Sequence, residues 1–404
     1  MVKRFIRRTI NPILYFINDS RFTGILLICC TLVSLILSNA GTGDWYRHFW
    51  NSTIHYGNNI HLPHSGLKWI NDFLMAFFFL FAGMEIKREL VEGELASFKR
   101  AILPFAAAIG GMLVPALIYS AFNINTEFAQ GWGIPTATDI AFSLGIASLF
   151  GKRIPNSLKI FLMALAIIDD LGAIIVITFF YGGEVQWGFL TAAVGIYGLF
   201  WVANFLKVKA GMLHIFLSVV LWYMIFNSGV EASISGVLVA FTLPVNTLPL
   251  LEKIMHKFVN FIILPVFALA NTAILIPPDI INSLQTSVGF GIMAGLVIGK
   301  PVGIFLFSMA MLSLKLAKLP TNTNLQQLLG IGSLAGIGFT MSIFTTALAF
   351  RQEGFRNIAM IAVLFSLVLS LILSWIYFML IDRKMPKPAH KKLSYRVSPN
   401  LAIG

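Results

Sequence analysis

Two adjacent carboxylic acids, Asp169 and Asp170, lie in the apolar stretch LAIIDDLGAIIVIT, residues 165–178. Neighbouring residues of a helix project about 100° apart, so one small partner cannot satisfy both acids and both must border a cavity. Two carboxylates held close together with little water resist being ionised at the same time. An ionised carboxylate offers hard oxygen ligands to a small monovalent cation. The pair therefore predicts a site at which protons and a small monovalent cation compete for the same oxygens.

Three more residues of the apolar stretches are candidates for this site. Lys300, in LVIGKPVGIFLF, is the only cation in the middle of such a stretch and is the expected partner of one of the acids. Asp139, in GIPTATDIAF, lies where two half-helices would direct their N-terminal ends at a gap, and its carboxylate would offset their partial positive charges. Thr138 would add a hydroxyl and a free carbonyl as neutral cation ligands.

Other acids in or near the apolar stretches are Asp72, Glu85 and Glu231. Ionisable residues at membrane depth usually mark an ion or proton path. For Asp72 and Glu85 a structural ion pair or a helix-end cap remains open as the alternative. For Glu85 this alternative rests on the charged residues Lys87, Arg88 and Glu89 that follow it.

Membrane-spanning helices are the elements that must hold these side chains. The chain is 57% hydrophobic and only 11% charged, whereas soluble domains average about 25% charged residues. Apolar runs of about 20 residues, enough to cross the hydrocarbon core as a helix, recur along the chain. We expect one integral membrane domain over residues 1–404, all-α and polytopic, with about 12 transmembrane helices. Their centres fall near residues 31, 77, 112, 142, 170, 196, 220, 238, 267, 300, 338 and 369.

The distribution of basic residues orients these helices. Alternating the spans places 24 of the 29 Lys and Arg on one side and four on the other, with Lys300 inside a span. By the positive-inside rule both termini face the cytoplasm, and the number of spans is even. We expect a cytoplasmic N-terminal segment at residues 1–21 and a basic cytoplasmic tail at 382–404. The net charge of +12 therefore reflects loops between spans and not a nucleic-acid surface.

An inverted repeat relates spans 3–5 to spans 10–12. The middle member of each triplet is interrupted, by GIPTATDIAF at 133–142 and by AGIGFTMSIF at 335–344. Seven spans separate the triplets, so they enter the membrane from opposite sides. Paired interrupted segments in an inverted repeat indicate a transporter with its site near the midplane.

The motifs PTATDIAFSLG, LAIIDDLGAIIVIT, GKPVGI and GIGFTMSIF occur in this order, and with them nearly the whole chain resembles the NhaA-type sodium/proton antiporters. Inverted repeats are a known property of that family, so the repeat and the resemblance are not independent. The resemblance implies crossed, interrupted helices 4 and 11. It also implies that Asp169 and Asp170 hold the transported cation and protons, that Lys300 pairs with Asp169, that Asp139 balances the crossing, and that Thr138 is a ligand.

The resemblance further implies a pH-response cluster at the cytoplasmic face, at Glu85, Arg88, Glu89, Glu252, Lys253 and His256. Residues 41–66 resemble an extracytoplasmic hairpin that pairs protomers into a homodimer. One departure concerns Glu231 in SGVEASISGV, because the best-known member of the family has a histidine there, at a position associated with pH sensing. The bacterial cytoplasmic (inner) membrane is the expected location.

The expected function is secondary antiport, in which sodium or lithium is exported in exchange for protons, electrogenically with two protons per sodium and under pH regulation. We expect no cofactor and no enzymatic activity. A sodium-coupled organic-anion symporter of similar architecture is the alternative, and it would need an anion-binding lining beyond Lys300. A membrane enzyme with acidic pairs, such as a prenyltransferase, would need a second aspartate cluster near a membrane face to hold Mg²⁺. Whether the second proton binds Asp169 or Lys300 stays open.

Overall fold

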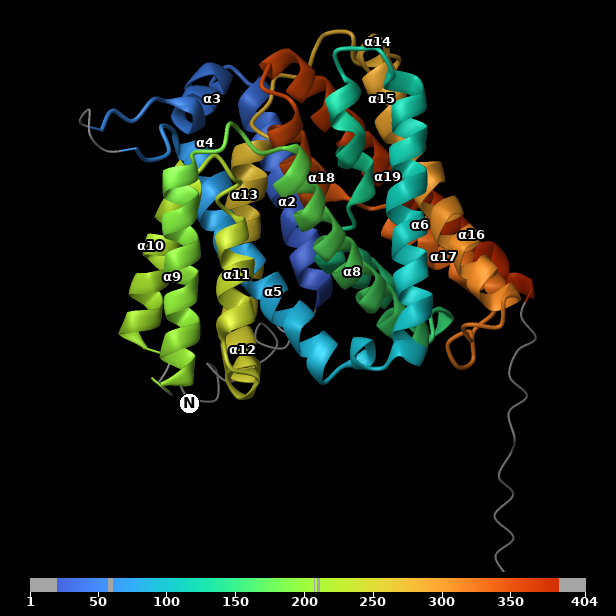
Figure 1. Cartoon of the computed structure of the whole chain (residues 1–404). Helices are drawn as coiled ribbons and strands as arrows, with labels where there is room; N and C mark the ends of the chain where they lie inside the picture. Colours follow the sequence, from blue (N-terminus) through green and yellow to red (C-terminus); the bar gives the residue numbers. More distant parts are fainter. Residues whose placement is uncertain (1–19, 57–60, 207, 209–210, 385–404) are drawn as a thin grey trace, which may run out of the picture.

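Residues 20–56, 61–206, 208 and 211–384 are described by the computed structural model of the chain, and most of them lie in helices packed side by side (Figure 1). The expected segments 1–21 and 382–404 fall almost wholly outside the described residues. The only strand-like pairing within the described residues is an isolated antiparallel bridge between Thr53 and Ser65. The predicted all-α class is confirmed.

The first half of the chain carries the two acids. Its elements are α2 (Ser20–Asn39), α3 (Gly43–Asn51), α4 (Gly66–Lys68), η1 (Trp69–Leu74), α5 (Met75–Val91), η2 (Glu94–Ala96), α6 (Phe98–Asn123), η3 (Ala129–Thr136), α7 (Ile140–Leu149), η4 (Gly151–Arg153) and α8 (Asn156–Phe180).

The second half carries Lys300. Its elements are α9 (Trp187–Phe205), α10 (Met212–Asn227), α11 (Ile234–Thr242), η5 (Val245–Thr247), α12 (Leu248–Phe258), η6 (Val259–Ile263), α13 (Leu264–Asn271), α14 (Ile280–Leu284), α15 (Ser287–Ala294), η7 (Gly295–Gly299), α16 (Lys300–Ser313), α17 (Leu325–Ala335), α18 (Phe339–Ala349) and α19 (Glu353–Lys384).

Eight helical segments of the described chain are long and apolar enough to cross a membrane, and the bent pair α17 and α18 raises this number to nine. Eleven of the twelve predicted centres fall within helices, and the twelfth, Gly338, falls at the 47° bend between α17 and α18. The chain is thus a multi-pass membrane protein. The number of twelve spans stays a prediction, because α7, α10 and α11 are short.

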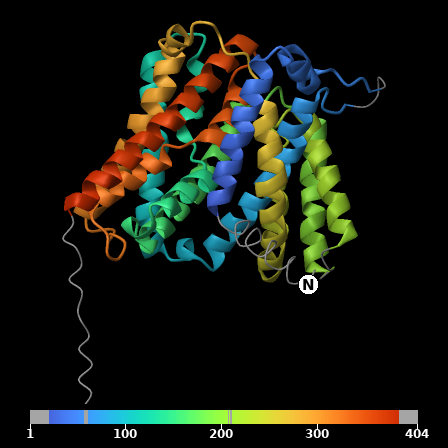
Figure 2. The same cartoon turned by 180° about the vertical axis from the view of Figure 1, so that it is seen from behind.

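Helix α8, which carries Asp169 and Asp170, is the most enclosed of the long helices. In its most apolar window 67% of the residues are buried, against 17% for α9. Figure 1 shows α8 running through the middle of the molecule, and Figure 2 shows α2 and α13 side by side on the other face. The acids therefore lie where protein surrounds the helix, as expected of charged groups at membrane depth.

Helix α16 is placed by close packing against α6. A Cβ atom at Gly303 of α16 would collide with the carbonyl oxygen of Gly110 on α6, and a Cβ at Gly110 would collide with that of Gly303. Small residues let membrane helices approach closely. The wide turn η7 comes just before Lys300 and Pro301, whose ring cannot supply the next helical hydrogen bond. Together these features set the position of Lys300.

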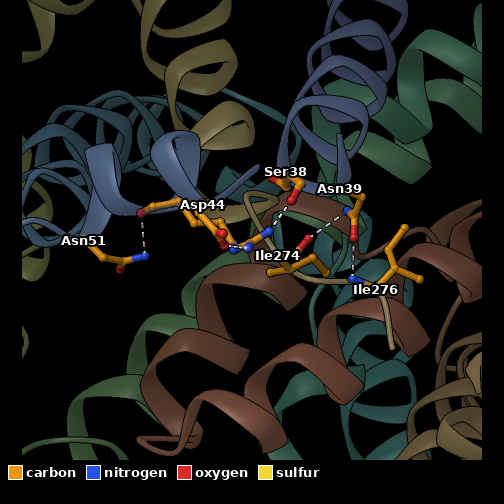
Figure 3. A network of polar contacts seen from close by, with 7 residues as sticks. Ser38, Asn39, Asp44, Asn51, Ile274 and Ile276 are labelled. Carbon is orange, nitrogen blue, oxygen red and sulfur yellow. Dashed lines mark hydrogen bonds and ion pairs between the residues drawn. The ribbon is translucent and has the colours of Figure 1, made fainter. Parts of the chain in front are cut away.

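The segment predicted as a hairpin, residues 41–66, is largely helical in its first part. It contains α3, followed by the bridge from Thr53 to Ser65, and the middle of its turn lies outside the described residues. Figure 3 shows how the end of α2 holds this region together: Asn39 bonds the backbone of Ile274 and Ile276, and Arg47 of α3 bonds the carbonyl oxygen of Ser38. Its role in pairing protomers stays a prediction.

Candidate functional site

Asp169 and Lys300 form a buried ion pair between α8 and α16. Lys300 Nζ lies 2.9 Å from Asp169 Oδ2, and both side chains are fully buried. The same ammonium donates to the carbonyl oxygen of Thr136 at 2.5 Å, where η3 ends. The hydroxyl of Thr138 lies 2.6 Å from Asp169 Oδ2 and 3.0 Å from the carbonyl oxygen of Ala335. The pair is therefore held on two sides by the interrupted segments.

Asp139 joins the two interrupted segments to each other. Its Oδ1 accepts from the backbone N–H of Phe142 at 2.9 Å and so caps the first turn of α7. Its Oδ2 accepts from the backbone N–H of Thr340 at 3.2 Å and from the Thr340 hydroxyl at 2.5 Å, in the first turn of α18. One carboxylate thus meets the N-terminal ends of two half-helices, where negative charge is favourable.

The carbonyl groups freed by the two interruptions are bonded within the protein. Lys300 bonds that of Thr136, as described, and Thr138 that of Ala335. The backbone N–H of Asp139 donates to Ile337 O at 2.8 Å, and Ser342 Oγ donates to Ile134 O at 2.8 Å. Broken helices at membrane depth are tolerated only where such partners exist. The interruptions are therefore a built arrangement around Asp169 and not locally unfolded chain.

Asp170 faces a cavity of about 230 Å³ instead of a partner. Its side chain is 3% exposed, and its Oδ1 has no hydrogen-bond partner among the described residues. Glu85, His256 and Asn260 line the same cavity, together with Thr23 from the first turn of α2. The cavity therefore extends from Asp170 toward the end of the molecule that carries most of the basic residues.

Most residues of the predicted pH-response cluster lie together at this end. Arg88 Nη1 lies 3.1 Å from Glu252 Oε2, and Arg88 Nη2 lies 3.6 Å from Glu89 Oε1. Glu85 is close enough to interact electrostatically with all three. His256 contacts Asn260 on the cavity wall at 3.0 Å. Lys253 is exposed and forms no ion pair with another described residue.

Asp72 and Glu231 lie apart from the site. Neither lines the cavity at Asp170, and the two acids interact electrostatically with each other and with Lys68. Glu231 also accepts a hydrogen bond from Ser233 at 3.3 Å. The structure therefore separates these two acids from the acids on α8.

Sequence reasoning missed Thr340 and the carbonyl of Thr136, both of which contact the charged groups. Thr340 stands in GIGFTMSIF, the counterpart of the segment that holds Asp139. The pairing of the two segments was therefore a signal that one would bond the other. The Thr136 carbonyl had no signal in residue type, because any residue carries one.

A buried Asp–Lys pair flanked by two interrupted helices, beside a second acid on a cavity, defines a membrane transporter of small ions. A family model described as Na⁺/H⁺ antiporter 1 matches residues 15–378. An NhaA 2 Na⁺/H⁺ antiporter of Flavobacterium johnsoniae is 48% identical over 88% of this chain and 89% of that protein. An NhaA 2 antiporter of Clostridium beijerinckii is 41% identical over 97% of this chain and 98% of its own length.

These similarities show that the chain belongs to the NhaA family of Na⁺/H⁺ antiporters. The resemblance drawn from its motifs is confirmed, and the family is one of transporters. The roles of the individual residues remain proposals.

Proposed function

We propose that this protein exports Na⁺, and also Li⁺, in exchange for protons, with Asp170 and Asp169 as the binding residues. The observation that carries the proposal is the Asp170 carboxylate, which lines a cavity and whose Oδ1 has no partner in the part of the chain that the structure describes. Asp169 stands beside it with one oxygen on Lys300 and Oδ1 unpartnered. Two carboxylates with free oxygens suit a hard cation, and protonation of either removes that ligand.

The exchange follows from exclusive occupancy. When the site faces the cytoplasm, a cation displaces protons from the acids, and when it faces outward, protons displace the cation. Thr138 supplies a neutral oxygen next to Asp169, and Asp139 keeps the ends of α7 and α18 together while the site changes sides. If two protons leave for each cation that binds, the cation-loaded site carries one positive charge fewer than the protonated site.

Two protons per cation are expected if Asp170 carries one proton and one member of the Asp169–Lys300 pair carries the other. One net positive charge would then move inward per cycle, and the membrane potential would contribute about 2.3 kcal/mol per 100 mV. The second proton binds either Asp169 or Lys300. In the second case the ion pair of Lys300 with Asp169 breaks each time a cation binds.

The test uses purified protein in liposomes, with Na⁺ exchange driven by a pH gradient. A potassium and valinomycin clamp sets the voltage. If protons enter the liposomes, a negative interior should speed up the exchange, and this result supports the two-to-one ratio. An exchange rate that does not change with the imposed voltage contradicts the ratio but not the exchange itself. Asp170→Asn is the matched variant. If this variant still exchanges Na⁺ for protons, Asp170 is not the binding residue.

Control by pH is assigned to the cluster of Glu85, Arg88, Glu89 and Glu252, together with Lys253 and His256. Glu85 and His256 stand on the cavity wall between this cluster and Asp170. A change of charge there alters the potential that a cation meets on its way in. Arg88→Gln should shift the pH at which exchange is half-maximal while leaving the ion dependence at the optimum, and an unshifted profile would contradict this assignment. Glu231, remote from the cavity, stays a separate candidate.

The location that fits is the bacterial inner membrane, with both termini in the cytoplasm, and the protein is expected to be a homodimer through residues 41–66. Trp45 and Phe49 of α3 stack on one another and are 69% and 56% exposed, which supports a contact surface there. Cross-linking through a cysteine in place of Asp44 tests this pairing. Monomers at all protein concentrations would contradict it.

The organic-anion symporter is not favoured by the cavity. Within the described residues, its lining contains no lysine or arginine, and Lys300 is already engaged by Asp169. An anion would therefore meet the acids Glu85, Asp139 and Asp170 without a lysine or arginine to balance them.

A further inference from the structure

A second cavity, of about 670 Å³, lies at the end of the molecule that carries most of the basic residues, and it shares no lining residue with the cavity at Asp170. It is lined by η2, by the N-terminal turns of α6 and α8 and by the loop that joins α16 to α17, and its four basic residues are exposed. Figure 1 shows these elements meeting at the lower right.

Positive charge dominates this second cavity. Its lining includes Lys99 and Arg100 of α6 and Lys315 and Lys318 of the loop, against the single acid Glu94. Arg100 Nη1 lies 3.4 Å from Glu94 Oε1. The three lysines form no ion pair with any acid that the structure describes. The cavity therefore holds an excess of positive charge that no acid of the described residues neutralises.

The backbone is bent to bring two of these lysines there. Lys315 follows the end of α16 with a φ of +57°, a left-handed conformation in which glycine is the usual residue. The amide of Leu316 then donates to the carbonyl oxygen of Met311 at 3.0 Å and closes the helix end. Ser157 Oγ of α8 donates to Thr321 O at 2.6 Å and fixes the loop on α8. A lysine at this strained position indicates that its side chain has a use.

The remaining walls are apolar and reach the lipid-facing surface. Leu103 and Phe161 form a buried floor, whereas Ile160 and Leu316 at the rim are 43% and 56% exposed. Helices α6 and α8 begin here, at Phe98 and Asn156, and α16 ends here. The cavity thus lies where long apolar helices enter or leave the membrane, at the depth of lipid headgroups.

We propose that this cavity binds the headgroup of an anionic phospholipid from the cytoplasmic leaflet. The four basic side chains hold its phosphate, and an acyl chain lies along Ile160 and Leu316. A free phosphate ion would use the charges but not the apolar rim, which favours the lipid as the source. Basic pockets between membrane helices on this side suit such headgroups. The bound lipid would connect the C-terminal end of α16 to the N-terminal end of α8. Helix α16 is the one that carries Lys300, and helix α8 is the one that carries Asp169.

The test measures binding of phosphatidylglycerol and cardiolipin, with phosphatidylcholine as the neutral lipid, to delipidated full-length protein by native mass spectrometry. Lys315→Gln with Lys318→Gln removes two charges from the cavity. Lys253→Gln with Lys257→Gln removes two from α12 on the same side. The cavity variant should bind anionic lipid about thirtyfold more weakly and the α12 variant nearly as well as the unchanged protein. Equal loss in both variants would mean general attraction to the basic surface and would overturn the proposal.

Two further measurements separate lipid from phosphate and binding from folding. Inorganic phosphate at millimolar concentration should not displace the lipid, and displacement would overturn the lipid as ligand. Lys315→Gly removes a charge and relieves the left-handed backbone, so it should raise the thermal unfolding temperature of lipid-free protein while weakening lipid binding. Unchanged lipid binding in Lys315→Gly would contradict the proposal even if every other variant failed to fold.

Discussion

The two neighbouring acids of α8 face opposite kinds of surroundings. Asp169 points into the packed junction of the interrupted segments, where Lys300 and Thr138 hold one of its oxygens. Asp170, one residue on, lines a cavity of about 230 Å³ and forms no ion pair within the described residues, whereas Oδ1 of both acids lacks a partner there. Both are buried to a similar extent.

This difference separates two requirements that a cation exchanger has to meet. A charged residue with fixed partners keeps the broken helices in place, and a charged residue without partners remains available to ions. The contrast leads us to expect that changes at Asp170 act on transport, whereas changes around Asp169 act on stability as well. Each prediction below tests one side of this contrast.

The largest effect is expected from Asp170→Asn. The amide cannot exchange a proton, so Na⁺ exchange in liposomes should fall to the level of liposomes without protein. Its unfolding temperature should not fall, since an unpartnered buried charge contributes no stabilising contact. Exchange above one tenth of the unchanged protein's rate would mean that the cation is held elsewhere.

Removing the partner of Asp169 should mainly lower stability. Lys300→Met leaves a buried carboxylate without a counter-charge and should lower the free energy of unfolding by about 3–5 kcal/mol. Protonation of Asp169 relieves this loss, so the deficit should shrink in acidic buffer and grow in alkaline buffer. Chemical unfolding in detergent at several pH values measures it.

Asp169→Asn combined with Lys300→Met is the matched control. The double variant should recover most of the lost stability, because a neutral pair leaves no charge unpaired. A double variant as unstable as Lys300→Met would show that the ion pair is not the source of the stability.

The approach of α16 to α6 tests how Lys300 is positioned. In Gly303→Val the new side chain meets the backbone of Gly110, which cannot yield, and stability should fall by about 3 kcal/mol. Gly195→Ala in α9 is the control, because a Cβ there meets nothing within 4 Å, and it should be neutral or slightly stabilising. Equal thermal unfolding of the two variants would contradict the close contact.

The smallest effect concerns Asp139. Thr340→Val removes a hydroxyl hydrogen bond to its carboxylate but leaves the backbone N–H of residue 340, so the loss should be about 1.5 kcal/mol. Transport should persist, slowed, because neither Asp169 nor Asp170 is touched. Thermal unfolding measures the loss, and Thr345→Val in the same helix, whose hydroxyl bonds only Met341 O, serves for comparison. A loss of exchange as complete as in Asp170→Asn would place Thr340 in the ion site.

Sequence alone predicted the helical class and the residues that meet at the site, for a physical reason. Charge at membrane depth is costly, so Asp139, Asp169, Asp170 and Lys300 stand out from the apolar stretches around them. Glycine and proline near residue 135 and glycine near residue 338 likewise predicted the interruptions. Such residues free backbone groups that must form hydrogen bonds elsewhere.

The parts that sequence did not predict depend on contacts between distant segments. Residue type does not show that the Thr136 carbonyl accepts a hydrogen bond from Lys300. Nor does it show that Asp170, and not Asp169, lines the cavity. The family resemblance implied a hairpin at 41–66, and the structure shows α3 in its first part, with Arg47 of α3 bonded to the carbonyl oxygen of Ser38 at the end of α2. Such outcomes depend on packing, which local patterns do not encode.

The most direct measurement is the affinity of the purified protein for Na⁺ by calorimetry, across buffers from pH 6 to pH 9. If cation and protons exclude one another at Asp170 and Asp169, the dissociation constant should rise about tenfold per pH unit of acidification for one displaced proton, and more steeply for two. A dissociation constant that stays the same over the whole range would contradict the account.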